Sequence, residues 1–420
     1  MAWTIRTVFA FALALAALAG SPAAAFAGEA ADWTRAALES GDLAAGEAKL
    51  AARLDANAGD DEARLGLGAV RFVAAVQRFA ETEYHYGFTP IRRDLPIGAD
   101  LNPLPPNPKP DPLSYEDQRA ILQALLDDFA KVDATLASLG DSDASLTLDL
   151  YAIRLNVTGA NAPEARPTLG ALIAGFGAPR GAPPPANPDR LEAVFDRADA
   201  LWLRGYLHAI SAGLEFALAY DWRESFDRYA FLFYSGATPS TGAPVPPPAA
   251  RRPMVMPGEE SVLDVVGFIH SIHWRCVEPE RMRKAREHFK TVVALNRAIW
   301  PIALARKDDR THWIPAPGQK SLALPSLELT PEKLKAWQGA VDEFDALLDG
   351  DKLAPFWRYD LGIDFRAFFE KPSDFDLVYW LTGPGAWPYL RAGPTMTAQE
   401  WNAMQAAFGG NFLKYLVWLN

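Results

Sequence analysis

The chain has 420 residues, half of them hydrophobic, and a net charge of −11 at neutral pH. This composition supplies enough apolar side chains for a large core, and the acidic balance disfavours binding to nucleic acid phosphates or to anionic membrane surfaces. Cys276 is the only cysteine, so no internal disulfide can form.

The first residues have the pattern of a secretory signal peptide. Arg6 precedes an unbroken run of apolar and small residues over 8–20, and a small-x-small site follows at 25–27. The run is shorter than the roughly 20 apolar residues that a spanning helix needs. We therefore predict a signal peptide over 1–27, with an uncleaved anchor as the alternative. The mature chain would begin near Gly28 in the periplasm or outside the cell, with no membrane span.

An N-terminal helical lobe is expected over residues 28–175. Apolar residues at helical spacing predict helices near 32–39, 44–56 and 62–86. The first two are separated by a break at Gly41-Asp42.

The stretch ALESGDLAAGEAKLAARLDANAGDDEARLGLGAVRF resembles a tetratricopeptide repeat over residues 31 to about 80. The resemblance places Gly41-Asp42 in the turn of a helix pair, and it places Ala44 and Ala48 where the two helices pack closely. One and a half repeats are too few for a solenoid, which needs about three. We therefore expect repeat-like helical hairpins at the N-terminus and not a repeat protein.

A proline-rich segment, residues 90–112, interrupts this lobe. It contains eight prolines and cannot be helical, because proline fixes φ and lacks a backbone donor. Leu95, Leu101 and similar residues give it apolar side chains, so we predict an ordered strap that packs on the second lobe. The alternative is a disordered linker. Ser114 then begins a helix, with a capping box to Asp117.

The second lobe, residues 189–420, is predicted to be helical and rich in tryptophan. Proline- and glycine-rich linkers are expected at 176–188 and 235–258. The predicted helices are 189–220, 261–276, 280–300, 331–348 and 398–407. Strand-like alternation is scarce, so the predicted class is mainly α, with long Pro-rich loops joining an aromatic-rich lobe to the N-terminal hairpins.

Two histidines and the cysteine lie within the stretch FIHSIHWRC, residues 268–276. On a helix, His273 and Cys276 would lie inside the apolar stripe, with His270 at its edge. We predict that they belong to the core. A zinc site is the alternative, but a catalytic zinc needs three protein ligands. We expect no metal and no cofactor.

Sequence signatures of catalysis are lacking, since the chain has no nucleophile elbow, zinc-protease, phosphate-loop or Cys-x-x-Cys motif. Asp196, Asp199, His208 and Glu215 lie on one predicted helix, but no three of them share a face. We interpret them as salt-bridge partners of nearby arginines.

The aromatic residues give the candidate site. Eleven of the 13 tryptophans lie from Trp202 onward, some of them close to carboxylates, which suits either a glycan groove or a packed helical core. A cleft between strap and second lobe would gather the predicted ligand-binding residues, which are Tyr86, Trp202, Tyr206, His208, Trp357 and Arg358. The alternative is that these aromatics only join the two lobes.

The segments YHYGF, LPPNPKP, WLRGYLH, WIPAP and PFWRYD together resemble an uncharacterised family of exported bacterial proteins, a resemblance that implies export but no activity. We predict a non-catalytic binding or interaction protein of the bacterial cell envelope, whose partner is an unknown protein or a small-molecule or glycan ligand. The alternative is a glycan-active or metal-dependent envelope enzyme. That enzyme would need two carboxylates or three metal ligands in its main cleft.

Overall fold

The computed structural model describes residues 28–88, 104–160, 166–175, 190–242, 259–307, 310–318 and 328–419. It is mostly helical, which confirms the predicted mainly α class. The longer helices are α2 (Glu29–Ser40), α3 (Leu43–Ala56), α4 (Asp61–His85), α5 (Tyr115–Ala137), α7 (Arg197–Ala219), α9 (Glu259–His270), α10 (Pro279–Ala305), α11 (Pro331–Asp349), α14 (Ala398–Ala407) and α15 (Phe412–Leu419). Within these residues, no helix is both long and apolar enough to cross a bilayer.

Short elements connect these helices. The short helices and 3-10 turns are η1 (Leu150–Ala152), α6 (Leu169–Gly175), α8 (Arg223–Tyr229), η3 (Ala230–Leu232), α12 (Phe365–Glu370), α13 (Leu377–Thr382) and η5 (Pro384–Tyr389). The strands are β1 (Leu146–Asp149), β2 (Glu192–Phe195), β3 (Tyr220–Asp221), β4 (His273–Cys276), β5 (Ala354–Pro355), β6 (Gly362–Ile363), β7 (Phe375–Asp376) and β8 (Leu390–Arg391).

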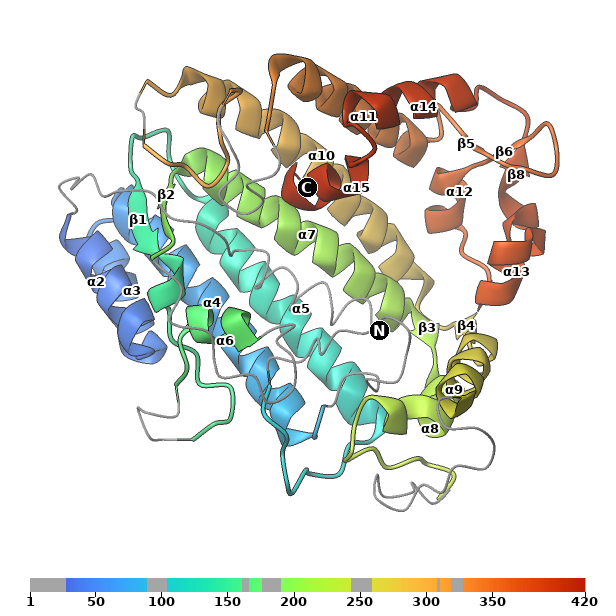
Figure 1. Ribbon diagram of the computed structural model, residues 1–420, viewed down its shortest axis with the longest axis horizontal. Helices are drawn as coiled ribbons and strands as arrows, with labels where there is room; N and C mark the ends of the chain where they lie inside the picture. The colour runs from blue at the N-terminus through green and yellow to red at the C-terminus, as the bar shows by residue number, and fades with distance from the viewer. Residues whose placement is uncertain are drawn as a thin grey trace.

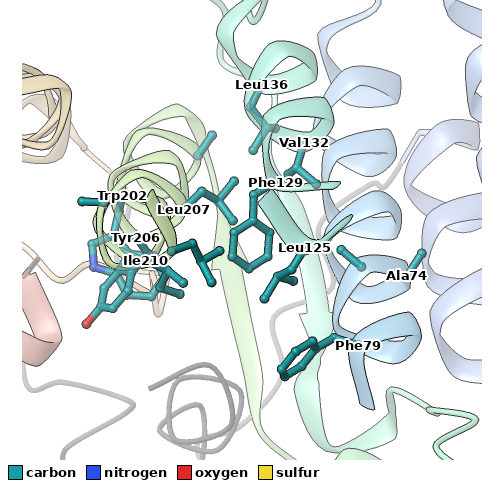
Figure 2. Packing of buried hydrophobic residues seen from close by; sticks show 14 of the residues in the cluster. Ala74, Phe79, Leu125, Phe129, Val132, Leu136, Trp202, Tyr206, Leu207 and Ile210 are labelled. Atoms are coloured by element: carbon teal, nitrogen blue, oxygen red, sulfur yellow. The ribbon is translucent and has the colours of Figure 1, made fainter. Parts of the chain in front are cut away.

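Helix α7 runs through the middle of the molecule. It packs against α10 on one side and α5 on the other, and α4 lies beyond α5 (Figure 1). Figure 2 shows Leu207 directed from α7 toward Phe129 of α5. Buried residues from both predicted lobes belong to one hydrophobic cluster, so the core is continuous along the described chain.

The first two helices meet at glycine positions. Gly41 ends α2 with a left-handed φ of 73°, and its N–H donates to the Ala37 carbonyl. Gly46 of α3 lies so close to α2 that a Cβ added there would be 2.3 Å from the Cβ of Ala37. The sequence break at Gly41 therefore marks a real helix-pair turn.

The predicted close packing at Ala44 and Ala48 is wrong, because both side chains are exposed. The buried face of α3 consists of Leu43, Gly46 and Leu50, which are three and four residues apart. The helix begins one residue earlier than predicted, and burial of its leucines rotates the two alanines toward solvent.

Most of the predicted strap over 90–112 lies outside the described residues, but its C-terminal part is docked. Leu104 is buried in the core. The Asn107 amide donates to carbonyls at the end of α4, and directly after the strap the Leu113 N–H donates to the carbonyl of Gly236. This end of the strap joins α4 to the segment that follows α8.

The predicted helix starts at Ser114 and Thr397 are confirmed. Each side chain accepts from the backbone N–H three residues on, and Asp117 or Glu400 at that position accepts in return. These reciprocal bonds satisfy two of the donors that a helix N-terminus leaves unpaired.

The prediction of one helix over 189–220 is wrong in its first turns. Residues 192–195 form β2, which pairs antiparallel with β1. Helix α7 begins only at Arg197, because Asp196 has extended backbone angles and its carboxylate accepts from the N–H groups of Ala198 and Asp199. The N-cap aspartate and the partner strand together override the helical pattern.

The predicted helix over 261–276 ends at His270, and residues 273–276 form β4 between β3 and β7. Strand alternation exposes His273 and leaves Cys276 half-buried. His270 at the end of α9 is exposed too, so the prediction that these residues belong to the core is wrong for both histidines. Ser271 ends the helix, since its hydroxyl donates to the carbonyl of Phe268.

Candidate functional site

A cavity of about 510 Å³ lies between α7, α10, α11 and the C-terminal helices α14 and α15. Its volume falls within the range of about 300–1,000 Å³ that is usual for ligand pockets. Aromatic and aliphatic side chains form nearly all of its wall, among them Tyr206, Ile210, Phe289, Phe344 and Trp401.

A glycine opens this cavity on the side of α7. Tyr206, Ile210 and Gly213 follow one another at spacings of four and three, so they lie on one face of the helix. A Cβ added at Gly213 would meet no atom within 4 Å. In Figure 2, Tyr206 lies on the side of α7 away from Leu207 and the α5 core. At Gly213 the cavity side of α7 therefore has no side chain to fill the space.

The buried amide in the cavity wall holds the C-terminal helix in place. Asn296 is 1% exposed, and its Oδ1 accepts from the indole N–H groups of Trp300 and Trp337 at 3.2 and 3.0 Å. Its Nδ2 donates to the carbonyl of Leu419 at 2.7 Å. The polar groups of Asn296 are thus used by the fold, which leaves an apolar surface toward the cavity.

Among the described residues that line the cavity, Glu343 of α11 is the charged one. The Nζ of Lys352 lies 2.7 Å from the Glu343 carboxylate and 3.0 Å from that of Glu400 on α14. This ion cluster joins α11 to α14 beside the cavity and compensates the Glu343 charge.

A second, smaller cavity of about 110 Å³ lies by the first turn of α7, and there carboxylates do converge. The ligand atoms of Asp196, Asp199 and His312 lie within 4.8 Å of one another, close enough for the three side chains to share a metal ion. The guanidinium of Arg306 stands among them, however. It binds Asp196 through two hydrogen bonds of 2.7 Å and lies 3.2 Å from Asp199.

The protonation chemistry of this cluster is that of a structural ion pair. Burial raises the pKa of Asp199, which also accepts from the Ile314 N–H at 2.8 Å. Burial opposes ionisation of Asp196 as well, but hydrogen bonds and charge from Arg306 hold the pKa of Asp196 below its usual value. The arginine therefore supplies the positive charge that a metal would otherwise bring.

A histidine pair lies at the junction of α5, α7 and α10. The Nδ1 atoms of His208 and His288 are 2.7 Å apart, so one of them carries the shared proton. The Nε2 of His208 lies 3.3 Å from the carboxylate of Asp133, which also accepts from Arg204. Burial and the neighbouring His208 lower the pKa of His288 to about 4. His288 is therefore uncharged near pH 7.

The predicted ligand-binding residues are distributed over several places. Tyr206 lines the larger cavity, and Trp202, whose ring centroid is 4.7 Å from that of Tyr206, lines the smaller one. Tyr86 caps α4, and Trp357 is exposed with Arg358 over its ring at 4.1 Å. Tyr86 and Trp357 line neither cavity, and His208 belongs to the histidine pair.

Sequence reasoning missed two parts of the larger cavity. Gly213, like Gly205, lies in the interior of α7, where glycine is less favourable than alanine by about 1 kcal/mol. The helix over Phe412–Leu419 was not predicted, although its apolar run is strong. Both signals were present in the chain, but neither identifies a cavity until the helices are packed.

Scans against protein-family models, curated proteins and solved structures find no significant match to this chain.

Proposed function

We propose that this chain is an exported, non-catalytic binding protein of a bacterial cell envelope, and that an apolar small molecule is its ligand in the larger cavity. The observation that carries the proposal is a cavity of about 510 Å³ whose wall is almost entirely apolar. Apolar cavities of about 150 Å³ already stay dry and take up apolar molecules. Export is inferred from the signal-like residues 1–27.

The chemistry of the wall favours an apolar ligand over a glycan. A sugar needs many hydrogen-bond partners, and an apolar wall would leave its hydroxyls unpaired at a cost of about 1–3 kcal/mol each. Asn296 already bonds to two indoles and a backbone carbonyl. A binding role is also favoured over catalysis, because the converging carboxylates lie at the other cavity and are paired with Arg306.

A matched pair of glycine variants tests the ligand site. Gly213→Leu adds a side chain on the cavity side of α7, at a position where a Cβ meets no atom within 4 Å. Gly339→Leu makes the same change at an exposed position of α11 where a Cβ is equally free. N-phenyl-1-naphthylamine, an uncharged fluorophore, serves as the probe in a fluorescence titration. We expect at least about tenfold weaker probe binding for Gly213→Leu, as for a loss of about 1.4 kcal/mol, and no change for Gly339→Leu.

Equal probe binding by both variants, or no binding by the unchanged protein, would contradict the proposal. Export is tested separately, by N-terminal sequencing of the protein from the soluble envelope fraction. The expected first residue lies near Gly28, and an intact Met1 in a cytoplasmic fraction would contradict export.

A further inference from the structure

The face that covers the larger cavity has an unusual composition. It is formed by α14 and α15 and the turn between them, which we call the C-terminal cover, residues 396–419. In this segment the charged residues are Glu400 and Lys414, whereas 22% of the whole chain is charged. The cover therefore has no net side-chain charge, although the chain as a whole carries −11.

Apart from Thr397, Glu400 and Lys414, the exposed side chains of this cover are small, amide or apolar. Leu413 is 69% exposed, Trp401 is 45% exposed and Leu416 is 43% exposed. Leu413 and Leu416 are three residues apart on α15, so they are neighbours on its surface. The exposed positions around them are mainly alanine, glycine, asparagine and glutamine. A surface of this kind loses little solvation free energy when water leaves it.

This apolar surface is continuous with the cavity. Trp401 and Leu416 are exposed to solvent and also belong to the cavity wall. The Trp401 ring packs edge-on against Phe412 of α15, another lining residue, at a centroid distance of 6.1 Å. Two of the three exposed apolar side chains thus connect the outer surface with the interior.

We infer that the C-terminal cover docks onto the surface of a zwitterionic lipid bilayer, so that an apolar ligand passes between membrane and cavity without crossing water; this rests on the proposed function. Tryptophan suits the boundary between headgroups and acyl chains, and the leucines suit the acyl side. The acidic remainder of the chain is repelled by anionic lipids, so a neutral bilayer fits this neutral face best.

A lipid surface fits this face better than a protein partner does. A ligand that prefers the apolar cavity dissolves poorly in water and is concentrated in membranes. A bilayer accommodates the exposed leucines and leaves an apolar route to the cavity, whereas a rigid protein surface would close that route at Trp401 and Leu416.

Flotation of the purified mature protein with phosphatidylcholine vesicles tests the inference. Leu413→Asp places a charge on the cover, and Leu381→Asp places the same charge at a matched position of α13, since the two leucines are 69% and 68% exposed. We expect the unchanged protein and Leu381→Asp to float with the vesicles. We expect at least about tenfold less Leu413→Asp protein on the vesicles, because the contact of the leucine with lipid is lost and a charge faces the lipid instead.

The two proposals fail in different ways. Leu413 does not belong to the cavity wall, so Leu413→Asp should keep its affinity for the naphthylamine probe. Gly213→Leu should lose probe binding and still float with vesicles.

Protein that stays in the vesicle-free fraction would overturn membrane docking, as would equal losses in both aspartate variants. Sedimentation as a dimer that Leu413→Asp converts to a monomer, without vesicle binding, would assign this face to a second copy of the chain.

Discussion

Helix α7 passes two cavities, and the side chains around its first turn differ in kind from those around its middle. At the first turn, Asp196 and Asp199 meet Arg306, and the space beside them is about 110 Å³. Along the middle, Tyr206 and Gly213 face about 510 Å³ of apolar space.

The difference shows why one cavity can hold a ligand and the other is filled by structural contacts. Buried charges need partners at fixed distances, so the first turn is tightly cross-linked and leaves little room for a ligand. Apolar walls need no partners, so a missing side chain at Gly213 can leave open space without an unpaired polar group. The larger cavity, and not the carboxylate cluster, is therefore the candidate ligand site.

Replacement of Arg306, beside the first turn of α7, should have the largest effect on the free energy of unfolding. Arg306→Met leaves Asp196 and Asp199 without their cation, and loss of one member of a buried ion pair lowers the free energy of unfolding by about 3–5 kcal/mol. Urea unfolding monitored by circular dichroism measures the change. Arg366→Met, at an exposed pair with Glu370, is the control and should be indistinguishable from the unchanged protein. Equal midpoints for the two variants would contradict a structural role for Arg306.

A buried acid that faces a tyrosine and not an arginine should behave differently again. Burial raises the pKa of Glu83 to about 8, and the hydroxyl of Tyr234 donates to its carboxyl at 2.8 Å. The folded state therefore keeps a proton that the unfolded state loses above about pH 4.5. The stability from this group is complete below that pH and decreases as the pH rises to about 8, by at most about 1.4 kcal/mol per unit.

Urea midpoints measured between pH 5 and pH 8 test this. Glu83→Gln cannot titrate, so its stability should fall less steeply with pH than that of the unchanged protein. Parallel pH profiles for the two would show that Glu83 is ionised when folded.

The amide beside the larger cavity should matter for the C-terminal helix. Asn296→Ala removes the acceptor of two indole N–H groups and the donor to Leu419. We expect a loss of about 1–3 kcal/mol, as for buried polar groups left unpaired, together with faster amide hydrogen exchange in α15. Asn402→Ala, at an exposed position of α14, is the control. Unchanged amide hydrogen exchange in α15 would show that Asn296 does not hold this helix over the cavity.

The smallest expected effect is an increase in stability, for Gly213→Leu. Gly213→Leu should raise the free energy of unfolding, because leucine favours a helix over glycine by roughly 0.8 kcal/mol and its side chain fills apolar space. Gly339→Leu gains the helix preference alone, so its midpoint in urea should rise less. A destabilised Gly213→Leu would show that the space beside α7 is smaller than about 510 Å³.

Local signals in the sequence predicted much of the helical framework. Ser114 and Thr397 begin helices where their capping boxes predict, because a cap depends on bonds across three residues. The helix predicted to begin at residue 189 was wrong in its first turns, because pairing of β2 with β1 overrides the local helical preference of these residues. The prediction of a buried His273 on a helix was wrong for the same reason, because this residue lies in strand β4, which forms between two partner strands.

The helical class, the apolar helix faces, the turn at Gly41 and the acidic character of the chain can all be predicted from the sequence. Each of these depends on neighbours in the chain or on composition. Only the packing of helices brings Asp199 to Arg306, which lies more than a hundred positions away, and places Gly213 on the same cavity as α11 and α15. Such meetings depend on how whole helices pack, and a cavity depends on the space that the packed helices leave unfilled.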